Sequence, residues 1–173
     1  MVSIHERPAE VEDRGVPGHW EGDLLIGRYA QSVLGVLVER TTRLTLLAKP
    51  KSRDAADVRA AFVQAFRKVP SDLRKTLTYD QGKEMTEHEN LAEQTAIRVF
   101  FCDPQAPYQR GTNENTNGLL RQYFPKGTDF SAVTDRDLRF VMDRLNTRPR
   151  KVLDFQTPSE VRKEYRRGVA LRT

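Results

Sequence analysis

Residues 19–26 read HWEGDLLI, a run of loosely alternating β-favouring residues that carries Asp23. Strand interiors disfavour aspartate, so an acid at this position points to a function. Two strand-like runs follow, Ser32–Glu39 and Leu44–Ala48, with a polar turn between them. The first of these runs is nearly continuously apolar, as in a strand that is covered on both faces. The pattern predicts a meander of three strands with Asp23 on the first.

Helix and strand signals alternate through the rest of the chain. Two more strands are predicted, over Leu73–Asp80 and Arg98–Cys102. Capping residues and apolar stripes at helical spacing predict five helices, whose expected N-caps are Ser52, Thr86, Thr112, Thr134 and Thr157. Gly168 is the expected end of the last helix. The order β-β-β-α-β-α-β-α-α-α predicts an α/β fold, a mixed five-stranded sheet with helices on both faces.

Three acids lie on different predicted elements. Asp23 is on the first strand, Asp80 ends the strand before Gln81-Gly82, and Glu114 falls in the first turn of the helix that Thr112 opens. A helix dipole favours a charged carboxylate at that position. Carboxylates from separate elements can converge to hold hard divalent cations through oxygen ligands, and a pair of such ions can activate an attacking hydroxyl at phosphorus. Taken singly, Asp23 also fits a charge on an edge strand, Asp80 an ordinary turn and Glu114 a surface glutamate.

Composition limits the class of protein. The chain has 173 residues, of which 38% are apolar and 31% charged, and this balance is typical of one folded domain. No apolar run approaches the roughly 20 residues that cross a bilayer, and no signal peptide opens the chain. The single cysteine, Cys102, follows two phenylalanines and is interpreted as a buried strand residue. Its isolation excludes an internal disulfide and suits a cytoplasmic location.

The positive charge is concentrated at the C-terminus. Residues 148–173 contain eight Lys/Arg and three Asp/Glu, so they carry the whole net charge of +5. A basic segment on a neutral body suits a polyanionic partner, although a solvated helix face has the same composition. These observations divide the chain into a flexible lead-in over 1–17, a core over 18–147 and a basic helical tail over 148–173.

Three blocks of sequence together resemble a known family. They are Gly22-Asp23-Leu24, Thr78-Tyr79-Asp80-Gln81-Gly82 and Pro107-Tyr108-Gln109-Arg110-Gly111-Thr112-Asn113-Glu114-Asn115, with 33 residues between Asp80 and Glu114. In this order and spacing the chain resembles the catalytic core of DDE transposases and retroviral-type integrases, and one bacterial insertion-sequence branch in particular. The resemblance implies an RNase H-like fold, a Mg²⁺ or Mn²⁺ cofactor, expected as two ions, and DNA as substrate. It assigns metal binding and catalysis to Asp23, Asp80 and Glu114.

The resemblance also implies a mechanism and partners. A Mg-dependent polynucleotidyl transferase of this kind hydrolyses a phosphodiester at the element end and then joins the freed 3′-hydroxyl to target DNA. Residues beside Glu114 are candidates for DNA contact: Arg110, Asn113, Asn117, Arg121 and Lys126. Because two element ends must be brought together, a homodimer or larger assembly on DNA is expected.

Two other functions remain open at this point. One is an RNase H-like nuclease that cuts without strand transfer, and the other is a non-catalytic DNA-binding remnant of a truncated transposase. Transposases of this branch resemble longer chains with an N-terminal helix-turn-helix part, and the stretch before Asp23 is too short for one. The chain is therefore expected to be an excised catalytic domain or the product of a truncated gene.

Overall fold

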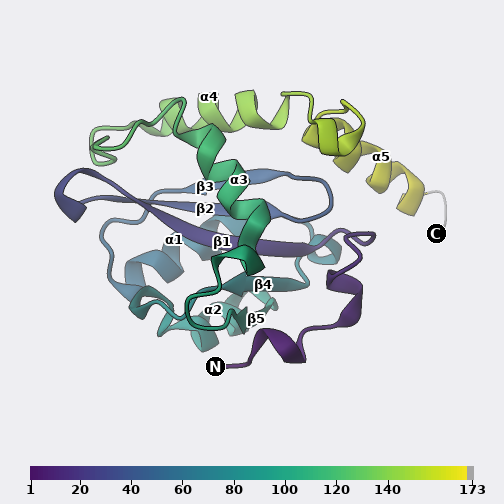
Figure 1. Cartoon of the computed structure of the whole chain (residues 1–173), viewed down its shortest axis with the longest axis horizontal. Helices are drawn as coiled ribbons and strands as arrows, with labels where there is room; N and C mark the ends of the chain where they lie inside the picture. The colour runs from purple at the N-terminus through teal and green to yellow at the C-terminus, as the bar shows by residue number, and fades with distance from the viewer. Residues whose placement is uncertain (171–173) are drawn as a thin grey trace.

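A five-stranded mixed sheet forms the centre of the computed structural model, which describes residues 1–170. Its strands lie in the order β3-β2-β1-β4-β5 (Figure 1). Their bounds are β1 His19–Ile26, β2 Val33–Glu39, β3 Thr45–Ala48, β4 Thr76–Tyr79 and β5 Arg98–Phe101. The mixed five-stranded sheet predicted from the sequence is thereby confirmed, with strand ends that differ by a few residues.

Pairing changes direction at β1, the middle strand. β1, β2 and β3 form the predicted antiparallel meander, whereas β4 lies parallel to β1 and β5 parallel to β4. The parallel register pairs Glu21 with Thr78. Two residues farther along each strand this register leads to Asp23 and Asp80, so the topology brings the first two acids to neighbouring positions.

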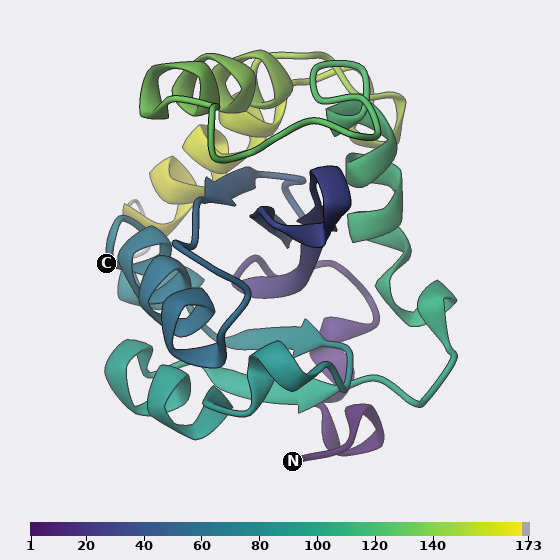
Figure 2. The ribbon, with the colours of Figure 1, turned by 90° about the vertical axis from the view of Figure 1, so that its left-hand side faces the viewer.

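Helices cover both faces of the sheet, as predicted. They are α1 Ala55–Arg67, α2 His88–Thr95, α3 Gly111–Leu120, α4 Asp135–Asn146 and α5 Pro158–Ala170. Figure 2 shows α1 and α2 on one side of the sheet and α3 on the other, with α4 at the top, across the end of the sheet that β3 forms.

Each face of the sheet has its own apolar core. Phe62 and Phe66 of α1 pack with Trp20 on the first face, where the Trp20 and Phe66 rings meet edge to face. Leu120, Val141 and Leu145 pack on the second face together with Val36 and Val38 of β2. Since β2 contributes to both cores, its apolar run is nearly continuous, for the reason expected from its sequence.

Several predicted helix ends are corrected by the structure. Asp54, not Ser52, occupies the N-cap of α1, and Ser52 instead accepts a hydrogen bond from the Asp54 amide. Thr86 belongs to a preceding 3₁₀ turn because its hydroxyl bonds back to Lys83, so no Thr86–Glu89 capping box forms.

The predicted start of α3 and the predicted end of α5 are also corrected. Helix α3 begins at Gly111, so Thr112 is a helical residue and not the N-cap. Helix α5 continues through Gly168 to Ala170, so that glycine does not end it. The caps at Thr134 and Thr157 are confirmed by their hydrogen bonds to Asp137 and Glu160.

The segment expected to be a flexible lead-in has structured contacts with the core. Ile4 and Val11 are buried, and Ser3 forms a bridge to Phe101 at the sheet edge. Glu10 lies 3.2 Å from the ring of His19 on β1. The segment 1–17 therefore closes the β5 side of the sheet, and the division into lead-in, core and tail remains a proposal.

The basic tail contains helix α5 and a buried arginine. The side chain of Arg150 donates to the carbonyl of Leu145 at 3.0 Å, and Tyr165 of α5 packs against the α1 face. Residues 171–173, the end of the predicted tail, lie outside the described residues. Across 1–170, none of the helices combines the length and apolar character that a bilayer crossing requires.

Close packing between β2 and α1 gives a stability prediction. A Cβ at Gly35 would overlap the buried ring of Phe62, so Gly35→Ala is expected to lower the free energy of unfolding by about 1–3 kcal/mol. Gly118→Ala is the matched control, because a Cβ there meets nothing within 4 Å and alanine is the better helix former. This variant is expected to gain about 0.5–1 kcal/mol. Urea denaturation measures both, and an unchanged Gly35→Ala midpoint would contradict the packing.

Candidate active site

A buried glutamate fixes the helix that crosses the sheet beside Asp23. Glu21 on β1 is 0% exposed and accepts a hydrogen bond from Nη1 of Arg40 at 2.8 Å. Its other oxygen accepts from the backbone amide of Asn113 at 2.9 Å, in the first turn of α3. A carboxylate is favoured there because a helix N-terminus has free amides and a partial positive charge. The contact holds α3 against β1 two residues before Asp23.

Asp23 and Asp80 are brought together at one guanidinium. Nη1 of Arg110 lies 3.1 Å from Oδ1 of Asp23, and Nη2 lies 3.2 Å from Oδ2 of Asp80. The same Nη1 donates to the carbonyl of Gly22 at 3.1 Å. Burial opposes the charge on Arg110, but Asp23 and Asp80 outweigh it and raise the pKa of Arg110 above its ordinary value. The two acids therefore share a cation that this chain supplies.

Asp23 is also held from the next turn of α3. Asn117 donates through Nδ2 to Oδ2 of Asp23 at 2.8 Å, and the amide of Leu24 donates to Oδ1 at 2.9 Å. These contacts place both oxygens of Asp23 in defined directions. They also show which face of α3 is turned toward β1.

Glu114 lies in the first turn of α3, between two residues of the chain that contact Asp23. It lies three positions before Asn117, a spacing that puts neighbouring side chains along one side of a helix. Glu114 itself is exposed. Within residues 1–170 no three His, Cys, Asp or Glu side chains form a group that could hold a metal ion. The structure thus unites Asp23 with Asp80 and puts exposed Glu114 in the first turn of α3, and convergence of the full trio remains a prediction.

The chemistry of the site suits a hard cation. Oδ1 of Asp80 and Oδ1 of Asn117 are buried and have no hydrogen-bond partner among the described residues. Buried oxygens without donors carry a desolvation cost that a bound cation would offset. All the candidate ligands are oxygens, the donor type that Mg²⁺ prefers. The residues present therefore fit the metal that the sequence predicted.

A tyrosine and a cysteine lie beneath the acids, and both stay neutral. Burial raises the pKa of Tyr79 well above its usual value, and Glu84, Asp23 and Asp80 raise it further. Burial raises the pKa of Cys102 to about 11, so its thiol is protonated at neutral pH. The interpretation of Cys102 as a buried residue is confirmed, although it lies just past β5. Neither group is placed to act as a nucleophile.

A pocket of about 360 Å³ opens beside Asp80. It is bounded by the segments 80–82 and 102–107 and by Arg110. The wall residue Asp103 is held by Gln109, whose side chain accepts from the Asp103 backbone amide and donates to the Asp103 carboxylate, both at 2.8 Å. The 3₁₀ turn Pro107–Arg110 is thereby tied to the strand end that follows β5.

The five residues predicted to contact DNA have different surroundings. Asn113 is 0% exposed and its backbone amide donates to Glu21, so in this structure it positions α3, and its contact with DNA stays a prediction. Arg110 and Asn117 both bind Asp23. Arg121 donates to the carbonyls of Phe124 and Pro125 at 3.4 Å, and Lys126 is exposed in the loop after α3.

Sequence reasoning overlooked Glu21, although a signal was present. Glu21 precedes Asp23 by two positions, so alternation along a strand puts both side chains on one face. Glu21 is therefore a second acid on the strand face that carries Asp23, and a buried acid needs a cationic partner. Arg40, in the polar turn after β2, is that partner. Their pairing across 19 residues of sequence was not visible from local pattern.

A family model agrees with this geometry. The integrase core domain model matches residues 13–107, which include β1 to β5 and both aspartates. The chain belongs to the integrase core domain family.

Integrase core relatives that share much sequence with this chain are transposases. A transposase for insertion sequence element IS1086 from Cupriavidus metallidurans is 55% identical over 161 residues, which are 93% of this chain and 48% of that protein. Transposase InsI for insertion sequence element IS30A from Escherichia coli is 47% identical over 168 residues, 97% of this chain and 43% of its own length. The chain thus spans about half the length of these curated relatives.

Solved integrase structures share the fold. The catalytic core domain of BIV integrase superposes with a TM-score of 0.64 at 20% identity, covering 88% of this chain and 98% of that one. A chain of a simian T-cell lymphotropic virus intasome, solved with PP2A regulatory subunit B56 gamma, gives a TM-score of 0.66 at 19% identity over 84% of this chain and 54% of its own. The predicted RNase H-like fold is confirmed.

The buried Glu21 contact yields a stability prediction. Glu21→Gln leaves Arg40 without its charged partner in the interior, which is expected to lower the free energy of unfolding by about 3–5 kcal/mol. Glu87→Gln is the matched control, since Glu87 pairs with Arg59 at a partly exposed site where an ion pair contributes about 0–1 kcal/mol. Urea denaturation compares the two variants. Equal losses would show that Glu21 has no special role in holding α3.

Proposed function

We propose that this chain is the catalytic core of a DNA transposase, which cuts phosphodiesters at element ends and joins the freed 3′-hydroxyl to target DNA. The observation that carries the proposal is the sharing of Arg110 by Asp23 and Asp80, next to the helix whose first turn carries Glu114. These are the acids that the family resemblance assigned to catalysis. Membership of the integrase core family and the transposase relatives support the same activity.

Asp23, Asp80 and Glu114 would hold Mg²⁺ or Mn²⁺, expected as two ions, through carboxylate oxygens. Such ions supply an activated attacking oxygen and stabilise charge on the leaving oxygen. The protein's own part is to orient the acids: Asn117 and the Leu24 amide fix Asp23, and Glu21 anchors α3. Asp80 has one buried oxygen free for a ligand.

The DNA partners follow from the same proposal. Element ends and target DNA are the expected substrates, and synapsis of two ends calls for a homodimer or larger assembly. Arg121, Lys126 and the basic residues of α5 are exposed enough to meet backbone phosphates. An RNase H-like nuclease without strand transfer remains the second candidate, because its cutting step needs the same acids. A non-catalytic remnant is disfavoured by the intact acid pair.

A nicking and joining assay tests the proposal. With Mg²⁺ and a pre-cut end that bears a 3′-hydroxyl, the chain is expected to nick and join DNA. Asp80→Asn is expected to lower both rates by about 10²–10⁴-fold, since a lost metal ligand removes several kcal/mol of transition-state stabilisation. Asp72→Asn removes the same charge from an exposed 3₁₀ turn and should leave both rates unchanged. Full activity of Asp80→Asn would refute the assignment, and hydrolysis without joining would favour the nuclease.

Arg110 gives an independent prediction about the metal. Mg²⁺ must compete with its guanidinium for Asp23 and Asp80, so Arg110→Gln is expected to bind Mg²⁺ about tenfold more tightly, a change of roughly 1.4 kcal/mol. Titration calorimetry without DNA measures the dissociation constant. Arg121→Gln is the control, because Arg121 caps the other end of α3 and donates to backbone carbonyls. Equal or weaker Mg²⁺ binding by Arg110→Gln would show that Arg110 does not act as the counter-ion.

A further inference from the structure

The turn Pro107–Arg110 separates two pockets of different charge. Pro107 and Arg110 line the pocket beside Asp80, whereas Tyr108 and Gln109 line a second pocket of about 470 Å³. The walls of this second pocket also include three arginines, which come from two parts of the chain: Arg7, Arg14 and Arg40. We refer to it as the arginine pocket. The four consecutive residues of this turn are thus divided between the two pockets, which lie on either side of it. A chain-like ligand can therefore pass over the turn from one pocket to the other.

Arginines outnumber carboxylates among the residues that line the arginine pocket. Glu12 is the one carboxylate among the described residues that line it, and its side chain is 65% exposed. Glu12 pairs with Arg7 and lies 4.0 Å from Arg40. Glu12 balances Arg7 and buried Glu21 balances Arg40, so the excess positive charge that favours an incoming anion is that of Arg14.

Two of the arginines are held rigidly by the core. Arg40 is 5% exposed at its side chain and donates to Glu21, and Arg7, at 4%, donates to the hydroxyl of Thr78 at 2.9 Å. Burial lowers the pKa of Arg40, and the neighbouring Arg7 and Arg14 lower it further against the opposing effect of Glu21. Rigid, closely spaced guanidinium groups lose little side-chain entropy when they bind an anion.

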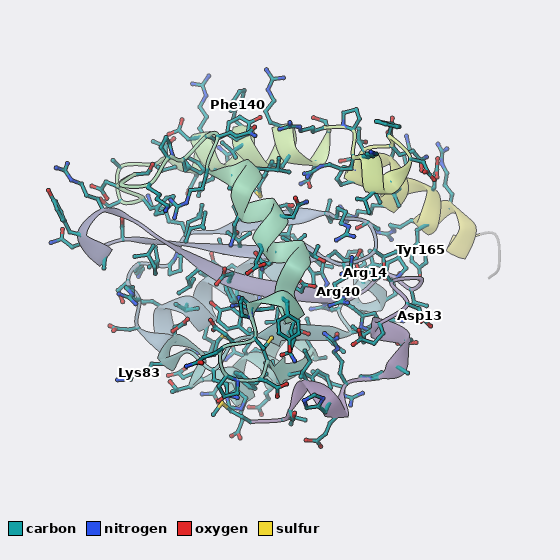
Figure 3. The ribbon with its side chains drawn as sticks, in the orientation of Figure 1. Asp13, Arg14, Arg40, Lys83, Phe140 and Tyr165 are labelled. Atoms are coloured by element: carbon teal, nitrogen blue, oxygen red, sulfur yellow. The ribbon has the colours of Figure 1, made fainter. Side chains whose placement is uncertain are left out.

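Arg14 differs from the other two because it is exposed. It has a left-handed backbone with φ of 52°, in the lead-in segment that packs against the core. Figure 3 labels Arg14 next to Arg40, with which it lines the pocket. Asp13, its neighbour in sequence, is not among the residues that line the pocket. Arg14 is therefore the arginine most accessible to an approaching ligand.

We propose that the arginine pocket binds a backbone phosphate of the DNA strand whose scissile bond lies at the acid pair. The proposal rests on the proposed function, which makes DNA the polyanion. Guanidinium groups match phosphate oxygens in geometry and stay charged, so they suit this task better than lysine. Tyr108 lies on the rim with its side chain exposed and offers a ring on which a base can stack. DNA held on both sides of the turn would be fixed in register at Asp23 and Asp80.

Binding without metal tests the pocket separately from catalysis. Fluorescence anisotropy of a labelled duplex in EDTA gives the association constant over a range of salt concentrations. Arg14→Gln is expected to weaken binding roughly 5–10-fold at 0.1 M salt and to reduce the slope of log K against log salt by about 0.9, the value for one lost phosphate contact. Because Arg14 is exposed, the variant should keep its Tm.

Two matched variants complete the experiment. Arg67→Gln removes an exposed arginine from α1, on the opposite face of the sheet from α3, and should leave affinity and slope unchanged. Arg14→Lys keeps the charge and should retain most of the slope. Equal affinity and slope for Arg14→Gln and the wild type would overturn the arginine pocket as a phosphate site.

The outcomes also separate this inference from the proposed function. Loss of affinity in Arg14→Gln together with no Mg²⁺-dependent nicking by the wild type would support the pocket and refute the catalytic proposal. Metal-dependent nicking by the wild type with undiminished DNA binding by Arg14→Gln would refute the pocket and support the catalytic proposal. An absence of duplex binding by the wild type in EDTA would overturn the pocket.

Discussion

The candidate site depends on a carboxylate that has no contact with solvent. Glu21 carries a charge into the interior, where desolvation is costly unless every oxygen has a good donor. It has two strong donors, the guanidinium of Arg40 and the amide of Asn113 at the start of α3. The contact joins the turn after β2, the central strand and the helix that crosses them. Together with the contacts that Arg110 and Asn117 make to β1, it holds the start of α3 to the strand that carries Asp23.

The sheet topology supplies the second constraint. A parallel pair extends both strands toward the same edge, so the register that pairs Glu21 with Thr78 leads to Asp23 and Asp80 as neighbours. Gly22 lies between Glu21 and Asp23 for a steric reason, because a Cβ there would come within 2.7 Å of the Tyr79 ring. That ring lies below Arg110, whose guanidinium is 6.0 Å from the ring centroid. A small residue on β1 therefore makes room for the side chains that support the shared arginine.

The strands and the two aspartates of the site could be predicted from the sequence, but the contacts between distant segments could not. Strand runs and acids could be assigned because period-two patterns and strand ends are local features. The burial of Asn113 could not, since Asn113 and exposed Glu114 are adjacent, and only the phase of α3 decides which of them faces the sheet. That phase depends on where the helix begins. It begins at Gly111, so Thr112, the expected N-cap, is already a helical residue. Thr112 fails as a cap because its hydroxyl already accepts from Arg43 at 2.8 Å, a contact between distant segments.

Charge is arranged asymmetrically around one short turn. On one side of Pro107–Arg110, Asp23 and Asp80 share a single guanidinium, and exposed Glu114 adds a third negative charge nearby. On the other side, arginines exceed carboxylates in the arginine pocket. A polyanion alone is repelled by the acids and attracted by the arginines, so its backbone can settle at the acids only when cations neutralise them. Under the proposed function, this asymmetry lets DNA bind near the acids before metal arrives and makes the reacting position dependent on metal.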